Sequence, residues 1–209
     1  DTYNAIVRDG HVDLEGIEIT PEAIEKIHNI VIVACGSAYH VGISLQYVIE
    51  DLARIPVRVE LASEFRYRKP LLDADTLVIV ISQSGETADS LAALREAKSR
   101  GARTLGIVNV IGSSIAREAD NVLYTLAGPE IAVATTKAYS TQLIAGYLLA
   151  IEFAKVRGYI NQDQYDGFLA DMEKLPKQIE GLLNDKERIQ WFASKFSNAH
   201  DVFFIGRGV

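Results

Sequence analysis

Short apolar runs rich in valine and isoleucine recur along the chain, and segments with helical spacing separate them. Such β-branched runs are typical of strands buried on both faces of a parallel sheet. Strand, helix and strand in repeated order indicate a doubly wound α/β fold. We therefore predict a three-layer α-β-α sandwich with a five-stranded parallel sheet, followed by C-terminal helices. The predicted strands are residues 30–35, 57–61, 76–82, 103–109 and 121–126.

The segment 85–102 shows the helical pattern most clearly. Leu91, Leu94 and Ala97 fall on one face, acidic residues lie near the start, and basic residues lie near the end. Gly101 then supplies a stop signal. This segment is the predicted crossover helix between the third and fourth strands.

After residue 134 the pattern becomes helical throughout. Residues 135–159 predict one long apolar helix, and further helices are expected over 161–183 and 185–199, with a kink or break at Pro176. The last residues, "DVFFIGRGV" (201–209), repeat the form of the first strand, an apolar run that ends in a glycine. They predict the first strand of a second α/β unit, so we expect the chain to be a fragment.

Composition argues against several classes of partner. The net charge is -7 with a pI of about 5.1, and the basic residues are scattered rather than clustered along a nucleic-acid-binding stripe. No apolar run approaches the roughly 20 residues of a membrane span, and the N-terminus lacks the layout of a signal peptide. A single cysteine, Cys35, fits a reducing compartment. We predict a cytoplasmic protein without nucleic-acid or membrane partners.

The stretch "VIVISQSGETADSL" (Val78–Leu91) places hydroxyl side chains, and no cation, where a strand passes into a helix. Ligands of open parallel sheets bind beyond the carboxyl ends of the strands, where helix N-termini offer unpaired N–H groups that hold phosphate without a lysine. The hydroxyls of Ser82, Ser84 and Thr87 add donors, and Gly85 lets the backbone approach an anion. The pattern predicts a site for a phosphate monoester.

Plainer interpretations stay open at each of these positions. Ser84 could be an ordinary N-cap in a polar turn. Gly36 and Ser37 follow the first strand and could face the same crevice, although Gly36 alone also fits a tight turn. Thr135 and Thr136 precede the long helix, and capping is the favoured interpretation for at least one of them.

Other chemistry has little support in the sequence. No dinucleotide, P-loop or nucleophile-elbow motif is present, so we predict no cofactor. The four histidines are far apart and make no metal-ligand spacing with cysteine or carboxylates. Cys35 is interpreted as a small core residue rather than a nucleophile. Lys137 is either solvated or paired with Glu130, so it is given no catalytic role.

Four stretches together resemble one known family closely. They are "ACGSAYHVG", "ELASEFRYR", "ISQSGETADSLAALREAK" and "AGPEIAVATTKAYSTQL". In this order and spacing they resemble the first sugar-isomerase (SIS) domain of the glutamine:fructose-6-phosphate aminotransferases, also called glucosamine-6-phosphate synthases. The likeness runs from about Pro21 to Gly206. The stretch "SEFRYR" distinguishes the aminotransferases from other SIS proteins, because many SIS proteins share an S-x-S-G-x-T loop but lack that stretch.

The resemblance implies a flavodoxin-like SIS fold and a place in a larger enzyme. Such enzymes have an N-terminal glutaminase domain, absent here, and two SIS domains that bind fructose 6-phosphate and isomerise the aminated product to glucosamine 6-phosphate for amino-sugar biosynthesis. They are homodimers through their SIS domains. The implied division is an N-terminal extension, the SIS domain, interdomain helices and the first strand of a truncated second SIS domain, at 1–20, 21–160, 161–200 and 201–209.

The resemblance also implies the binding residues. The family's phosphate-binding positions fall on the turn after the third strand, and its sugar contacts fall on Ser37 and Thr135. The family usually has Thr-Ser where this chain has Ser37-Ala38, and Ser where it has Thr135. Ala38 offers only its backbone N–H, which removes one hydrogen bond of about 1 kcal/mol. The predicted substrate-binding residues are Gly36, Ser37, Ala38, Ser82, Gln83, Ser84, Gly85, Thr87 and Thr135.

No catalytic residue is predicted in this chain. The resemblance places the isomerase glutamate and histidine in the second SIS domain and a sugar-binding lysine in the C-terminal tail, and none has a counterpart here. Proton transfer between sugar carbons needs a positioned base. We therefore expect binding without turnover. Two alternatives remain: a SIS-type regulator that binds amino-sugar phosphates without chemistry, and a structural dimerisation module suggested by the long apolar helix.

Overall fold

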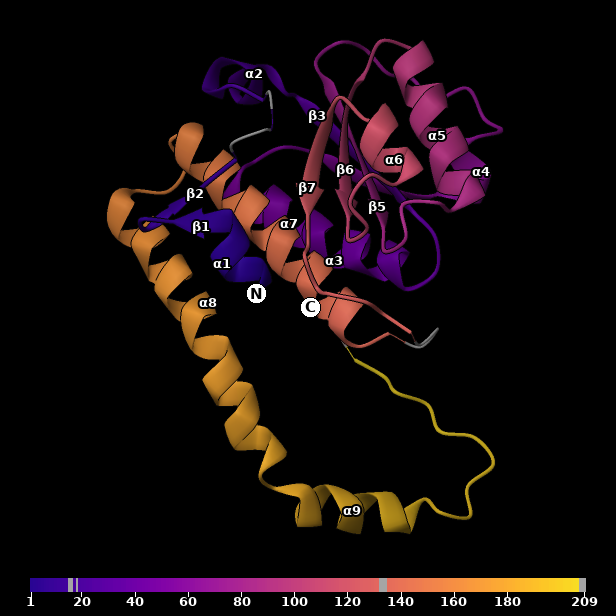
Figure 1. The fold of residues 1–209 in the computed structure, drawn as a ribbon, viewed down its shortest axis with the longest axis vertical. Coiled ribbons are helices and arrows are strands. Elements are labelled where there is room, and N and C mark those ends of the chain that lie inside the picture. The colour runs from indigo at the N-terminus through magenta and orange to yellow at the C-terminus, as the bar shows by residue number, and fades with distance from the viewer. Residues whose placement is uncertain (15–16, 18, 132–134, 207–209) are drawn as a thin grey trace.

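The chain folds as a three-layer sandwich, with helices on both faces of one sheet (Figure 1). The computed structural model describes residues 1–14, 17, 19–131 and 135–206. The sheet strands are β3 (Asn29–Ala34), β4 (Val57–Leu61), β5 (Thr76–Ser82), β6 (Arg103–Val108) and β7 (Asn121–Tyr124). The helices around them are α2 (Pro21–Lys26), α3 (Ser37–Leu52), α4 (Ala62–Phe65), α5 (Ala88–Ser99), α6 (Ser114–Glu118) and α7 (Lys137–Val156).

All five strands run parallel, in the order β4-β3-β5-β6-β7. The predicted sheet is confirmed, and each strand begins and ends within two residues of its predicted limits. The chain passes from β3 outward to β4 and then returns to the other side of β3 to form β5. This is the flavodoxin-like order, in which the direction of winding reverses between the first and third strands. The carboxyl ends of β3 and β5 therefore border a topological switch point.

The side chains of the central strands divide between two cores. Ile30 and Ile32 of β3 pack in the cluster that contains α3 and α7, whereas Val31 and Val33 pack in the cluster that contains α5. All four are fully buried. Because burying such a side chain contributes about 1.5 to 3 kcal/mol, both faces stabilise the strand. This explains why the apolar runs are continuous rather than alternating with polar residues.

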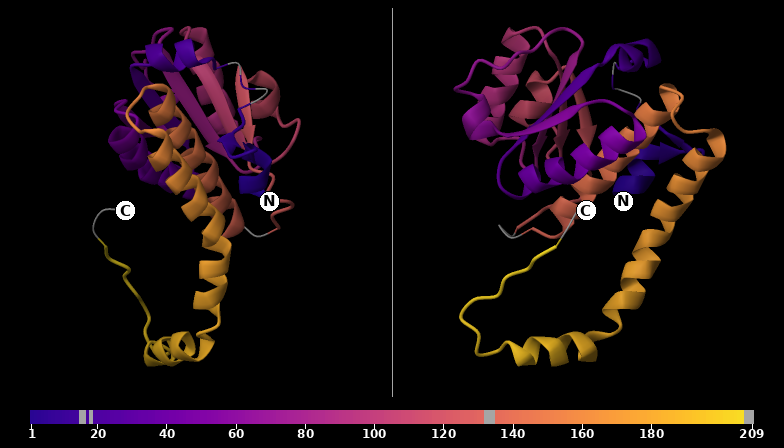
Figure 2. Two further views of the ribbon diagram at one scale, coloured as in Figure 1. Left: turned by 90° about the vertical axis from the view of Figure 1, so that its left-hand side faces the viewer. Right: turned by 180° about the vertical axis from the view of Figure 1, so that it is seen from behind.

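Helices α3 and α7 pack closely on one face of the sheet (Figure 2). Gly146 makes the close approach possible, since a Cβ built there would lie 2.3 Å from Cδ1 of Leu45. Leu45 itself is fully buried. Within the described part of the chain, no helix combines the length and apolar character needed to span a membrane.

The N-terminal residues pack beside α7 rather than extending away from the domain. They form α1 (Thr2–Ile6) and a small hairpin of β1 (Val7–Arg8) and β2 (His11–Val12). The hydroxyl of Tyr165 accepts a hydrogen bond from the N–H of Val12 at 2.8 Å and donates to Glu152 at 2.9 Å. Burial, together with the nearby carboxylate, raises the pKa of Tyr165. This tyrosine therefore joins the hairpin, α7 and the following helix.

The C-terminal part differs from expectation in two places. Helix α8 (Gln162–Leu183) continues through Pro176, so of the predicted kink or break the break is wrong, and α9 (Lys186–Lys195) follows. Residues 201–206 do not form the predicted strand, and the side chains of Phe204 and Ile205 are 96% and 94% exposed. A strand needs a neighbour to satisfy its backbone, and the described residues offer none to this segment. Residues 207–209 lie outside the described residues.

The contact between α3 and α7 generates a stability prediction. We expect Gly146→Ala to lower the free energy of unfolding by about 2 kcal/mol, because the added methyl group forces the buried Leu45 side chain out of place. Gly167→Ala in α8 is the matched control. A Cβ there meets nothing within 4 Å, so the helix should gain about 0.5 to 1 kcal/mol. Urea denaturation measures both, and equal effects would contradict the packing account.

Candidate functional site

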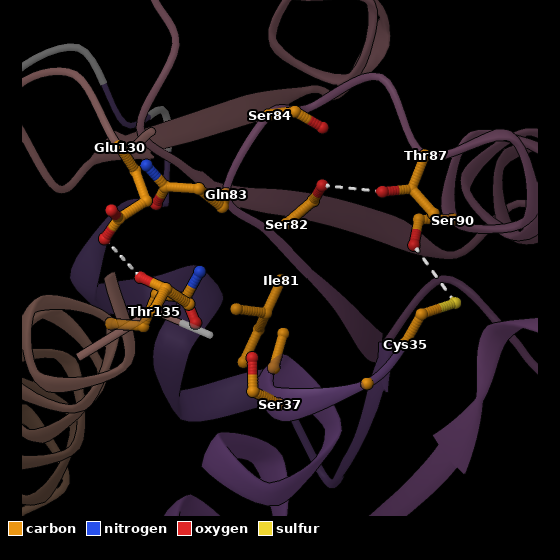
Figure 3. Close-up of a pocket in the computed structure, with 13 residues that line it drawn as sticks. Cys35, Ser37, Ile81, Ser82, Gln83, Ser84, Thr87, Ser90, Glu130 and Thr135 are labelled. Atoms are coloured by element: carbon orange, nitrogen blue, oxygen red, sulfur yellow. Dashed lines mark hydrogen bonds between the residues drawn. The ribbon is translucent and has the colours of Figure 1, made fainter. Parts of the chain in front are cut away.

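A cavity of about 640 Å³ opens at the carboxyl ends of β3 and β5, at the switch point of the sheet (Figure 3). Its walls come from the β3–α3 turn, the β5–α5 turn and the segment that leads into α7. Eight of the nine predicted binding residues line this cavity, namely Gly36, Ser37, Ala38, Ser82, Gln83, Ser84, Thr87 and Thr135. The ninth, Gly85, is not among the lining residues and instead supports the β5–α5 turn from the side away from the cavity.

Hydrogen bonds within the β5–α5 turn hold its hydroxyls around one space. Ser82 Oγ accepts from the N–H of Gly85 at 3.1 Å and lies 3.3 Å from Thr87 Oγ1. Ser84 Oγ accepts from the N–H of Glu86 at 3.2 Å. The N-cap of α5 is Thr87, so the interpretation of Ser84 as an ordinary N-cap is wrong. Ser84 belongs to the turn itself and lines the cavity.

Gly85 has a positive φ of 65° and lies against the turn before α6. A Cβ at this position would lie 2.1 Å from Ser113 Oγ. The carbonyl of Gly85 accepts a hydrogen bond from the N–H of Ile115 at 3.0 Å. Gly85 therefore lets the β5–α5 turn rest on the α6 segment, which fixes the direction in which its hydroxyls point.

Glu86 makes a second contact between the same two segments. Its carboxylate accepts a hydrogen bond from the N–H of Ser114 at 2.7 Å. The hydrogen bonds from Ser114 hold the pKa of Glu86 below its ordinary value. A carboxyl whose pKa is lowered on folding stabilises the fold above its ordinary pKa, and that contribution is lost as the pH falls through the lowered value. The clamp on the turn is therefore intact at neutral pH.

Two long helices direct their N-termini to the cavity without a side-chain cap. Gly36 is the N-cap of α3 and Thr87 is the N-cap of α5, and neither side chain bonds to the first turn of its helix. Their first backbone N–H groups are therefore available to a ligand. Each N-terminus carries roughly half a positive charge. Among the described residues that line the cavity, none is lysine, arginine or histidine, so the donors that face it are backbone N–H groups, hydroxyls and amides.

Thr135 has two roles at the start of α7. The N-cap position of α7 is Thr136, whose side chain makes no capping bond, whereas the hydroxyl of Thr135 accepts from the N–H of Ala138 in the first turn at 3.2 Å. Thr135 also donates to the carboxylate of Glu130 (Figure 3). Thr135 also lines the cavity. Lys137, by contrast, donates to the backbone carbonyl of Pro129 and does not line the cavity. The structure gives it no part in the site.

Sequence reasoning missed five residues that line the cavity: Cys35, Ile81, Ser90, Glu130 and Gln142. Cys35 packs against the core, as expected, but it is only partly buried, and its Sγ lies 3.9 Å from Ser90 Oγ. The sequence did carry a signal for Gln142, because a glutamine within an apolar helix needs a polar partner when it is buried. Glu130 had no such signal, since it follows a proline in a loop.

Comparison with known proteins agrees with this geometry. The family model described as the SIS domain matches residues 23–152. The chain belongs to the SIS domain family. The SIS fold predicted from the resemblance is thereby confirmed, together with the strand order of the sheet.

Curated relatives and a solved structure extend the similarity over the C-terminal helices. The glutamine–fructose-6-phosphate aminotransferase [isomerizing] of Caldanaerobacter subterraneus is 56% identical over 204 residues, which are 98% of this chain and 34% of that protein. The enzyme of the same name from Clostridium tetani is 56% identical over 198 residues, 95% of this chain and 33% of that protein. The chain thus spans about a third of the length of these relatives.

The similar solved structure is the C-terminal domain of glucosamine-fructose-6-phosphate aminotransferase from Francisella tularensis. The two structures superpose with a TM-score of 0.93 and are 37% identical in sequence. The superposition covers 99% of this chain and 58% of the Francisella tularensis chain. The resemblance drawn from the motifs is therefore confirmed at the level of sequence and of fold.

The Gly85 contact gives a prediction about the turn. We expect Gly85→Ala to lower the free energy of unfolding by about 3 kcal/mol, because the methyl group meets Ser113 and the residue keeps a positive φ. Gly112→Ala is the matched control, since Gly112 also has a positive φ of 71° but open space around it. Its free energy of unfolding should fall by only about 1 kcal/mol. Thermal and urea unfolding measure both, and similar losses would show that the contact with Ser113 is unimportant.

Proposed function

We propose that this chain is the sugar-phosphate-binding domain of a glutamine-dependent aminotransferase that makes glucosamine 6-phosphate from fructose 6-phosphate for amino-sugar biosynthesis. The observation that carries the proposal is the cavity at the switch point, which combines two uncapped helix N-termini with the Ser82–Thr87 turn. The names of the 56% identical relatives support the choice of sugar phosphate.

In this proposal the Ser82–Thr87 turn binds the phosphate. The hydroxyls of Ser84 and Thr87 and the first N–H groups of α5 donate to its oxygens. The net charge of -7 does not prevent this. Charges farther away than about 8 Å are largely screened at physiological salt, whereas the donors contact the phosphate at about 3 Å.

The sugar then lies toward Ser37 and Thr135. Thr135 already donates its hydroxyl proton to Glu130, so its oxygen is left to accept a hydrogen bond from a sugar hydroxyl. Ala38 offers a backbone N–H at the start of α3 in place of a side-chain hydroxyl. We expect this substitution to weaken the sugar contact by about 1 kcal/mol relative to a serine.

Binding, and not chemistry, is the role proposed for these residues. The described residues that line the cavity offer hydroxyls, amides and the carboxylate of Glu130, which already accepts from Thr135. Isomerisation needs a general base positioned at the sugar carbons. In the proposed enzyme, which acts in the cytoplasm, that base comes from a second SIS domain, and ammonia comes from a glutaminase domain.

We also propose that the chain forms a homodimer. Helices α8 and α9 expose several large apolar residues, including Trp191, which is 57% exposed, and Leu182, which is 72% exposed. Monomeric proteins rarely leave large contiguous apolar patches in water. A second copy of the chain would cover part of this surface.

Replacing the turn hydroxyls tests the phosphate assignment. We expect Ser84→Ala combined with Thr87→Ala to weaken binding of fructose 6-phosphate about 100-fold or more, because each hydrogen bond to a charged oxygen contributes about 1.5 to 3 kcal/mol. Ser99→Ala is the control, since Ser99 lies in the same helix but bonds only to the Glu96 carbonyl at its far end. Titration calorimetry measures the affinities. Unchanged affinity in the double variant would remove the phosphate from this turn.

The homodimer is tested by sedimentation velocity of the chain over a range of concentrations. We expect a dimer whose dissociation is promoted by Trp191→Lys, because a charge placed in an apolar interface loses its hydration. A monomer at every concentration up to about 100 µM, well above the affinity of a typical specific complex, would contradict this part of the proposal.

A further inference from the structure

Gln142 presents a buried carboxamide to the cavity. It lies five residues after the first residue of α7, about 7.5 Å along the helix axis, and it lines the cavity together with the phosphate-binding turn. Its side chain is 2% exposed. Among the described residues, no side-chain or backbone group forms a hydrogen bond with the Gln142 carboxamide. No atom of Gln142 is among the fully buried unpaired polar atoms of the described residues, so the carboxamide is accessible from the cavity and available to a ligand there.

Gln83, on the neighbouring wall, carries a fully buried acceptor. Its Oε1 atom is buried and has no hydrogen-bond partner among the described residues. In Figure 3 its side chain points away from Thr87 and toward the side of the cavity that holds Glu130. An amide oxygen accepts hydrogen bonds, so a ligand must supply a donor to pair with this atom. A fully ionised phosphate has no hydrogen-bond donor. A hydroxyl group both donates and accepts.

Charge separates the two ends of the cavity. Glu130 places a carboxylate beside Thr135, whereas the Ser82–Thr87 turn carries donors and no acid that lines the cavity. A phosphate next to Glu130 would be repelled, and a neutral polyol would not. The anionic end of a ligand therefore belongs at the turn, and its neutral end belongs at the wall formed by Glu130, Thr135 and Gln142.

We propose that Gln142 is a selectivity residue for the sugar portion of the ligand, with its carboxamide bonded to hydroxyl groups of a phosphorylated polyol whose phosphate lies in the Ser82–Thr87 turn. This inference rests on the proposed function and deepens it. A site built for hydroxyl groups rejects ligands that lack them, because its buried amides then stay unpaired. Gln142 thus separates sugar phosphates from simpler phosphate anions.

The test compares two ligands on the same variant. Gln142→Met keeps the length of the side chain and removes the carboxamide, both its C=O acceptor and its NH₂ donor. We expect its affinity for fructose 6-phosphate to fall about tenfold, which corresponds to about 1.4 kcal/mol, while its affinity for inorganic phosphate stays within about twofold of the wild type. Titration calorimetry on the whole chain gives both constants. Gln190→Met makes the same chemical change at an exposed position of α9 and should alter neither affinity.

Each outcome bears on the proposal. Equal losses for the two ligands, or no loss for either, would overturn the selectivity role of Gln142 and leave the proposed function standing. A lowered melting temperature together with lost phosphate binding would also overturn it, because the glutamine would then support the fold. If the wild-type chain binds neither ligand, the proposed function fails and this inference fails with it.

Discussion

Parallel pairing of β3 with β5 sets the geometry on which the cavity depends. The register joins Ala34 to Ile81, so the turns that follow the two strands leave the sheet at the same level. Because winding reverses between these strands, the turns diverge and leave a crevice between them. A slip of one residue would exchange the isoleucine and valine faces of β3 and lose both cores. The fully buried strands thus hold the site in place.

The helices on this frame supply positive potential where the sequence supplies no cation. α3 and α5 begin at the cavity from opposite faces of the sheet, and neither N-terminus is capped by its own side chain. The turn that would otherwise move freely is fixed from behind by Gly85 against Ser113 and by Glu86 against Ser114. Preorganised dipoles of this kind lose little orientational freedom on binding, which favours a compact anion over an extended polyanion.

Local sequence patterns were enough to predict the sheet, its parallel direction and five of the residues that line the cavity, namely Gly36, Ser37, Ser82, Ser84 and Thr87, because strand ends and turn glycines leave direct marks. Ala38, Gln83 and Thr135 were implied as binding residues only by the family resemblance. Cys35 packs against the core as predicted, but it also lines the cavity, because an apolar run does not show where a strand leaves the core. Gln142 reaches the cavity through the packing of α7, and Glu130 reaches it from the loop before that helix, so the position of neither at the site could be read from local sequence alone. Residues 201–206 form no strand, because no neighbouring strand among the described residues pairs with them, and the second α/β unit stays a prediction.

The central claim is that a phosphate is held here by backbone amides and hydroxyls without a basic side chain. A crystal structure of the chain soaked with fructose 6-phosphate tests it most directly. The account predicts phosphate oxygens at about 3 Å from Ser84, Thr87 and the first amides of α5, with no lysine or arginine in contact. A phosphate found against a basic side chain, or anywhere outside the Ser82–Thr87 turn, would contradict it.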